Sequence, residues 1–126
     1  MSIAELISTL KDGSGMARAR AASELGKTSD VRALSALHDA LNDKNPTVRS
    51  NAAFALGELK DHSATATLIS LLEDPDQWVR KSSAKALGLI RASEAETALE
   101  KALTDASELV QRNARRSLEQ IRKESP

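Results

Sequence analysis

The amino-acid sequence predicts an all-α fold, an α-solenoid of four helical hairpins with eight helices in total. The first observation is a segment that recurs every 31 residues, beginning at Ala17, Val48, Val79 and Val110. A fixed period of this length indicates stacked repeats. The second is composition, because aromatic residues make up only 2% of the chain and its apolar residues are mostly alanine and leucine, which favour helices. The third is the scarcity of chain breakers, with five glycines and three prolines in 126 residues.

Each repeat contains two helical patterns, an A helix followed by a B helix. We expect one domain of residues 1–126 with repeats at about 1–29, 30–61, 62–92 and 93–123. The predicted A helices cover residues 2–11, 30–42, 63–73 and 93–104. The predicted B helices cover residues 16–25, 46–59, 77–90 and 107–122. Leucines at helical spacing give every A helix one apolar stripe that faces the core: Leu6, Leu10, Leu37, Leu41, Leu68, Leu72, Leu99 and Leu103.

Capping residues mark several of these helix ends. Ser2 with Glu5, and Ser93 with Glu96, fit the capping box, in which each side chain binds the other residue's backbone N–H. Asn45 is a suitable N-cap, and Pro46 suits the first helical position because no donor is needed there. Gly26 is expected to end the first B helix in a left-handed conformation, which costs glycine little.

The composition excludes several classes of function. The chain has no cysteine, so disulfides, thiol catalysis and thiolate metal sites are absent. Eighteen basic and eighteen acidic residues give zero net charge, which argues against a strongly charge-driven nucleic-acid binder. No apolar run approaches membrane-spanning length, and the first residues do not resemble a signal peptide, so we expect a cytoplasmic protein without membrane contact.

No residues form a recognisable catalytic or metal-binding pattern. Glycine-rich phosphate loops and Ser–His–Asp arrangements are not visible in the sequence. The two histidines, His38 and His62, occupy unrelated repeat positions and have no acidic cluster beside them. We therefore expect no catalytic residue, no metal and no cofactor.

The B helices have an outward arc, which we call the B face. At about 100° per residue, Val48, Ala52 and Leu56 share one arc that must face the core. The opposite arc, transferred to all four repeats, forms the B face: Gly15, Met16, Ala19, Arg20, Ser23, Lys27, Pro46, Thr47, Ser50, Asn51, Phe54, Glu58, Gln77, Trp78, Lys81, Ser82, Lys85, Leu89, Glu108, Leu109, Arg112, Asn113, Arg116 and Gln120.

Aromatic and basic residues gather on the B face. It holds both aromatic residues of the chain, Phe54 and Trp78. Its six basic residues (Arg20, Lys27, Lys81, Lys85, Arg112 and Arg116) and two acidic ones (Glu58 and Glu108) give a net charge of +4. Aromatic anchors surrounded by arginine and lysine are typical of an interface centre. Two alternatives stay open: the rings pack between neighbouring helices, or the basic arc is an ordinary solvated surface.

The recurring segment Val-Arg-x-x-Ala-Ala-x-Ala-Leu-Gly, preceded by an aspartate in the turn, resembles the HEAT repeat in the short form of the phycobilin lyase HEAT-like family. The resemblance implies that B helices line a concave face and A helices a convex one. It also implies that turn aspartates and the following arginines form a ladder between repeats: Asp12, Arg18, Asp43, Arg49, Asp74, Arg80 and Asp105. Departures lie in the terminal repeats, at Ala17, Gln111, Arg115 and Glu119, and are expected of capping repeats.

These observations predict a non-enzymatic protein-binding scaffold. The partner would be another protein, with an acidic or mixed-charge segment or a helix that docks on the B face. The candidate binding residues are Arg20, Asn51, Phe54, Trp78, Lys81, Ser82, Lys85, Arg112, Asn113 and Arg116. The resemblance also leaves open a bilin lyase or isomerase subunit that handles a tetrapyrrole, and nucleic-acid binding is a less favoured alternative. An open solenoid end with Ile3 and Ile7 could mediate weak self-association.

Overall fold

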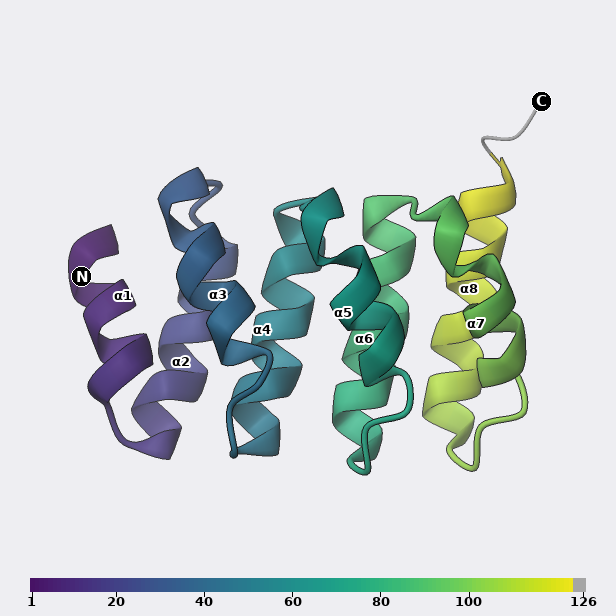
Figure 1. The fold of residues 1–126 in the computed structure, drawn as a ribbon, viewed down its shortest axis with the longest axis horizontal. Coiled ribbons are helices and arrows are strands. Elements are labelled where there is room, and N and C mark those ends of the chain that lie inside the picture. The colour runs from purple at the N-terminus through teal and green to yellow at the C-terminus, as the bar shows by residue number, and fades with distance from the viewer. Residues whose placement is uncertain (124–126) are drawn as a thin grey trace.

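The computed structural model describes residues 1–123, which form eight α-helices and three short 3-10 helices without any strand. Figure 1 shows the helices as a row of antiparallel pairs, with the first residues at one end and α8 at the other. The α-helices are α1 (Ile3–Asp12), α2 (Gly15–Gly26), α3 (Leu34–Ala40), α4 (Pro46–Glu58), α5 (Thr65–Leu71), α6 (Gln77–Ile90), α7 (Glu96–Ala102) and α8 (Glu108–Lys123). The 3-10 helices are η1 (Val31–Ala33), η2 (His62–Ala64) and η3 (Ser93–Ala95). The predicted all-α solenoid is confirmed.

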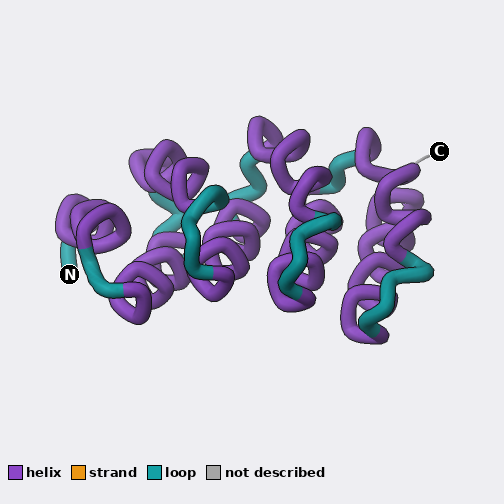
Figure 2. Tube along the Cα trace, turned by 60° about the horizontal axis from the view of Figure 1, so that its bottom comes forward, coloured by secondary structure: helices purple, strands orange, loops and turns teal. Residues whose placement is uncertain are grey.

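The eight helices lie in two layers, which the tilted view separates (Figure 2). The B helices α2, α4, α6 and α8 pack in sequence order against one another, and each A helix packs on the B helix of its own pair. The A helices make far fewer contacts among themselves, so the B layer is the continuous part of the solenoid. Within residues 1–123, every helix is too short or too polar to span a lipid bilayer.

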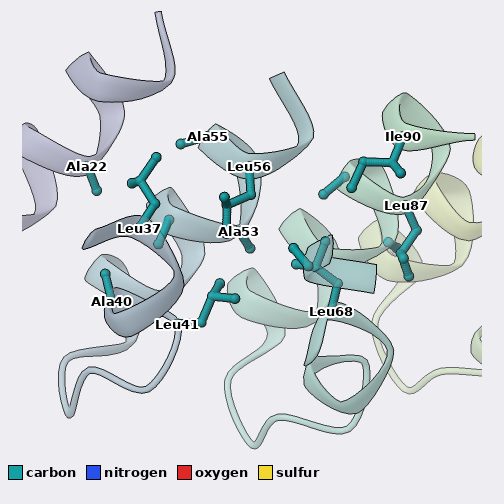
Figure 3. Close-up of a cluster of buried hydrophobic side chains, with 14 of the residues drawn as sticks. Ala22, Leu37, Ala40, Leu41, Ala53, Ala55, Leu56, Leu68, Leu87 and Ile90 are labelled. Carbon is teal, nitrogen blue, oxygen red and sulfur yellow. The ribbon is translucent and has the colours of Figure 1, made fainter. Parts of the chain in front are cut away.

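Leucines from both layers fill the space between them. Leu37, Leu56, Leu68 and Leu87 are completely buried, and Figure 3 shows them pointing into one apolar cluster with surrounding alanines. Burial of this kind stabilises a fold by about 25 cal/mol per Å² of apolar surface. The cluster runs through the repeats without interruption, which joins neighbouring repeats into one core.

Three of the four A helices begin with a 3-10 turn that the sequence analysis did not predict. Asp30 and Asp61 each precede such a turn, and their carboxylates accept hydrogen bonds from Arg32 N–H (2.9 Å) and Ser63 N–H (3.1 Å). The capping box of Ser2 and Glu5 is present, with both hydrogen bonds at 3.1 Å. The prediction for Ser93 and Glu96 is wrong, because Ser93 lies inside η3 and α7 has no side-chain cap.

The left-handed residues of the chain are not glycines. Ser29, Lys60 and Arg91, which are 31 positions apart, have φ angles of 56°, 53° and 61°, while no glycine of residues 1–123 has a positive φ. The prediction that Gly26 adopts this conformation is therefore wrong, since Gly26 is the last residue of α2 and Lys27 follows it in a right-handed conformation. The chain instead turns toward the next A helix a few residues later.

Glycine is needed where consecutive B helices approach each other. A Cβ atom added to Gly57 would lie 2.7 Å from the Cα atom of Ala86 on α6. The equivalent atom on Gly26 would lie 2.7 Å from Ala55 Cβ, and that on Gly88 would lie 2.7 Å from Ser117 Cβ. Atoms do not approach this closely, so a side chain at these positions would push neighbouring repeats apart.

We predict that Gly57→Ala lowers stability, although alanine is the better helix former by about 1 kcal/mol. The added methyl group meets the backbone of α6, and the clash should outweigh helix propensity and lower the free energy of unfolding by about 1–2 kcal/mol. Urea denaturation followed by circular dichroism measures the change. The control is Glu119→Ala, because Glu119 occupies the same repeat position on α8 but is exposed, and its stability should hardly change. A stabilised Gly57→Ala variant would contradict the proposed close contact.

Candidate protein-binding face

Ion pairs connect each A–B turn to the next one along the solenoid. Arg18 Nε and Nη2 donate to both carboxylate oxygens of Asp43 at 2.9 and 3.0 Å. The same two-bond geometry joins Arg49 to Asp74 (2.9 and 3.1 Å). It also joins Arg80 to Asp105 (2.9 and 3.2 Å). The aspartate follows the arginine by 25 residues every time, so the ladder always crosses from one repeat to the next.

Each ladder arginine also binds its own turn. Arg49 Nη1 donates to the carbonyl oxygen of Asp43 at 2.8 Å, so one guanidinium holds two successive turns in register. Gln111, which replaces arginine in the fourth repeat, keeps only this inner contact and donates to Asp105 O at 2.6 Å. At the other end, Asp12 is exposed and forms no ion pair within residues 1–123. The departure at Gln111 therefore removes only the contact that would point toward a further repeat.

The ladder changes the acidity of its carboxylates. The hydrogen bond from the Arg18 guanidinium lowers the pKa of Asp43, although burial opposes this, and a hydrogen bond from Asn45 N–H adds to it. Burial would raise the pKa of Asp105, but hydrogen bonds from Arg80 and from Ser107 N–H outweigh it and leave this pKa below its usual value. Folding thus favours the ionised form of both carboxylates.

The two aromatic residues of the B face differ in their surroundings. Trp78 stands at the beginning of α6 with 53% of its surface exposed, and it is the only tryptophan in the chain. Shallow hollows of about 490 and 250 Å³ lie on either side of it, the first toward Ser107 and the second toward Pro46. Phe54 on α4 is half-buried, and the Lys85 ammonium lies 5.4 Å from the centre of its ring. Neither ring is buried in the core.

The basic residues of the B face are free of carboxylate partners. Arg20, Lys27, Arg112 and Arg116 are exposed, and Lys81 and Lys85 are half-buried. Within residues 1–123, none of these six side chains forms an ion pair. Their charge is therefore available to a ligand, which distinguishes them from the ladder arginines.

The uncharged polar residues predicted for binding are used inside the fold instead. Ser82 is buried, and its hydroxyl lies 2.7 Å from that of Ser50 on α4. Asn51 Nδ2 donates to Ala19 O on α2 at 2.8 Å, which joins these two helices. Asn113 Nδ2 donates to Leu109 O of its own helix at 2.8 Å. These three residues therefore have partners inside the fold, whereas Trp78 and four of the six cations of the B face are exposed.

A cluster of His38, Asp61 and Ser63 was not predicted from the sequence. His38 Nε2 lies 2.6 Å from Asp61 Oδ2 and 3.2 Å from Ser63 Oγ, which itself donates to Asp61 at 2.7 Å. A proton relay from serine to aspartate needs both ring nitrogens, whereas here both partners meet the same one. The cluster links α3 to η2. Residues 1–123 contain no group of three or more histidine, cysteine or acidic residues placed to hold a metal ion.

A third hollow lies between α5 and α7, outside the B face. It has a volume of about 590 Å³ and is lined by Ile69, Leu72, Ala98 and Ala102, with the Arg80–Asp105 pair at its edge. The sequence analysis did not predict this hollow, and Ala102 does not mark it, because Ala40 occupies the same repeat position on α3.

A family model described as HEAT repeats matches residues 3–83 and again residues 65–126. The chain belongs to the HEAT repeat family. This confirms the resemblance inferred from the recurring segment. No curated protein sequence matches the HEAT array at a significant level.

Two solved structures resemble the HEAT array. Human deoxyhypusine hydroxylase in complex with glycerol superposes with a TM-score of 0.79 at 25% identity, over 98% of this chain and 44% of that one. The complex of CpcE and CpcF of phycocyanin lyase from Nostoc sp. PCC7120 gives a TM-score of 0.68 at 25% identity, over 98% of this chain and 66% of that one. The chain thus spans less than two thirds of each of these proteins.

We predict that Arg49→Gln destabilises the array strongly. The Asp74 side chain is only 6% exposed, and glutamine would leave its negative charge buried without a cationic partner. Removing one member of such a pair costs about 3 kcal/mol in free energy of unfolding. Urea denaturation tests this, with Lys101→Ala as the control because Lys101 and Glu73 pair at 77% and 73% exposure. The control should lose less than about 0.5 kcal/mol, and equal losses for the two variants would contradict the role of the ladder.

We also predict that the array loses stability in acid. Because the pKa values of Asp43 and Asp105 are lowered by folding, their stabilisation is complete above the ordinary aspartate pKa. It disappears as the pH falls from about 5 through the lowered values, where the carboxylates become protonated. Thermal denaturation across this pH range measures the effect. The double variant Asp43→Asn and Asp105→Asn should be less stable at neutral pH and should depend less on pH, whereas an unchanged pH slope would refute this explanation.

Proposed function

We propose that this HEAT array is a non-enzymatic scaffold that binds a partner protein on the B face. The observation that carries the proposal is Trp78, a large apolar side chain that is 53% exposed one helical turn before Lys81. It lies on a face whose cations form no ion pair within residues 1–123. Aromatic and basic side chains of this kind are the usual energetic centre of protein interfaces. An ordinary solvated helix face rarely retains an exposed tryptophan.

Trp78 and the cations of the B face would contribute to docking in different ways. Burial of Trp78 contributes about 25 cal/mol per Å², or a few kcal/mol before the entropic costs of association. The cations of the B face attract an acidic partner and fix its orientation. The similar phycocyanin lyase structure is itself a complex of two proteins, CpcE and CpcF, which supports a role in assembly.

Affinity purification with the tagged chain from its native cells tests the proposal. We expect a specific protein to co-elute with the wild-type chain and its recovery to fall at least about tenfold with Trp78→Ala, because the apolar anchor is lost. The matched control is Val31→Ala, which removes an apolar side chain with 77% exposure outside the B face and should leave recovery unchanged. Equal recovery by the Trp78→Ala variant, or no specific partner at all, would overturn the proposal.

A further inference from the structure

The charge of the B face is concentrated on its last two helices. Lys81 and Lys85 on α6 and Arg112 and Arg116 on α8 form two matching pairs, which we call the quartet. The same repeat positions on α2 and α4 carry only uncharged residues: Ala19, Ser23, Ser50 and Phe54. The repeat sequence therefore places four cations on one half of the face and none at these positions on the other.

Helix packing brings the quartet together. Residues four apart on a helix are neighbours, with Cβ atoms about 6 Å apart, so each pair is compact. The helices α6 and α8 are in close contact, because Ser117 Oγ donates to Ala84 O at 2.6 Å. Axes of helices packed in this way are about 8–10 Å apart. The four basic side chains thus originate from the corners of a small patch, in which charges of the same sign repel one another.

No ion pair neutralises this patch within the described residues, although the exposed Glu108 precedes Arg112 by one turn of α8. No member of the quartet forms an ion pair within residues 1–123, and the Lys85 ammonium rests against the Phe54 ring. Trp78 borders the patch one helical turn before Lys81, and the half-buried Leu109 takes the same position on α8. A ligand with several negative charges and one apolar group would be complementary to a cationic patch with an apolar edge.

We propose that the quartet and Trp78 form one site for an acidic peptide segment of the partner, with its carboxylates facing the quartet and an apolar side chain against Trp78. This proposal rests on the proposed function of the B face and limits the binding surface to α6 and α8. A nucleic acid fits less well, because a phosphate backbone needs a longer basic stripe. Here the quartet is followed on α4 by Ser50, Phe54 and the exposed Glu58.

Titration with a synthetic peptide tests the site, with Trp78 as the reporter. The probe is an acetylated, tryptophan-free peptide in which a leucine precedes a run of aspartate and glutamate residues. We expect saturable binding with a blue shift of Trp78 emission. A peptide with asparagine and glutamine in place of the acids should not bind. The double variant Lys85→Glu and Arg116→Glu should weaken binding at least about tenfold, since like charges then face each other.

The matched control is the double variant Lys11→Glu and Lys44→Glu, which makes the same change of charge at exposed positions outside the B face. Circular dichroism verifies that both variants fold. We expect the control to bind the peptide with unchanged affinity. Equal weakening by both variants, no binding of the acidic peptide, or tighter binding of a single-stranded oligonucleotide would each overturn the site. The proposed function is judged separately by partner recovery with Trp78→Ala, so either idea can fail alone.

Discussion

The close approach of consecutive B helices determines the rest of this structure. Gly26, Gly57 and Gly88 leave no room for a side chain, and Ala55, Ala86 and Ser117 are the small residues that meet them. Because the same contact recurs every 31 residues, each B helix meets the next one in the same way. Residues at one repeat position are thereby aligned across the layer. The ladder and the rows of the B face both follow from this alignment. The close packing of the B helices produces the alignment, and glycine is kept there although it is a poor helix former.

The ladder holds successive A–B turns in the same alignment as the B helices. A turn between two helices exposes backbone groups, and these must be hydrogen-bonded if the next repeat is to cover them. Asp74 accepts from the N–H of Asp76 and from both nitrogens of Arg49, while Arg49 donates to its own turn as well. Charges that are buried in this way are compensated within the fold, so they are not available to a ligand. The cations of the B face form no ion pair within residues 1–123. This difference separates the structural arginines of the ladder from the basic residues proposed to bind a partner.

The period and its register could be predicted from the sequence because they depend on identical contacts in every repeat. The B helices accordingly begin within a residue of their expected positions, and α6 matches residues 77–90. The role of the glycines could not be predicted, because a glycine at a helix end and a glycine at a close contact look alike until the neighbouring helix is placed. Ser82 was misjudged for a related reason. A single-helix projection treats its arc as solvent, whereas in the layer α4 covers it.

The first and last B helices, α2 and α8, each have an outer side without a neighbouring B helix. On these sides, glutamate occupies repeat positions that are packed against another helix in the inner repeats. Glu119 stands where Gly57 and Gly88 allow close contact, and Glu24 stands where Ala55 and Ala86 meet those glycines. Stacking one copy on another head to tail would set Glu119 against Glu24, with two like charges in a space that has no room for either side chain. Head-to-tail stacking of this kind is therefore opposed by both sterics and electrostatics, whereas the weak self-association expected through Ile3 and Ile7 stays a prediction. The B face has neither obstacle, which supports the proposal that another protein docks there.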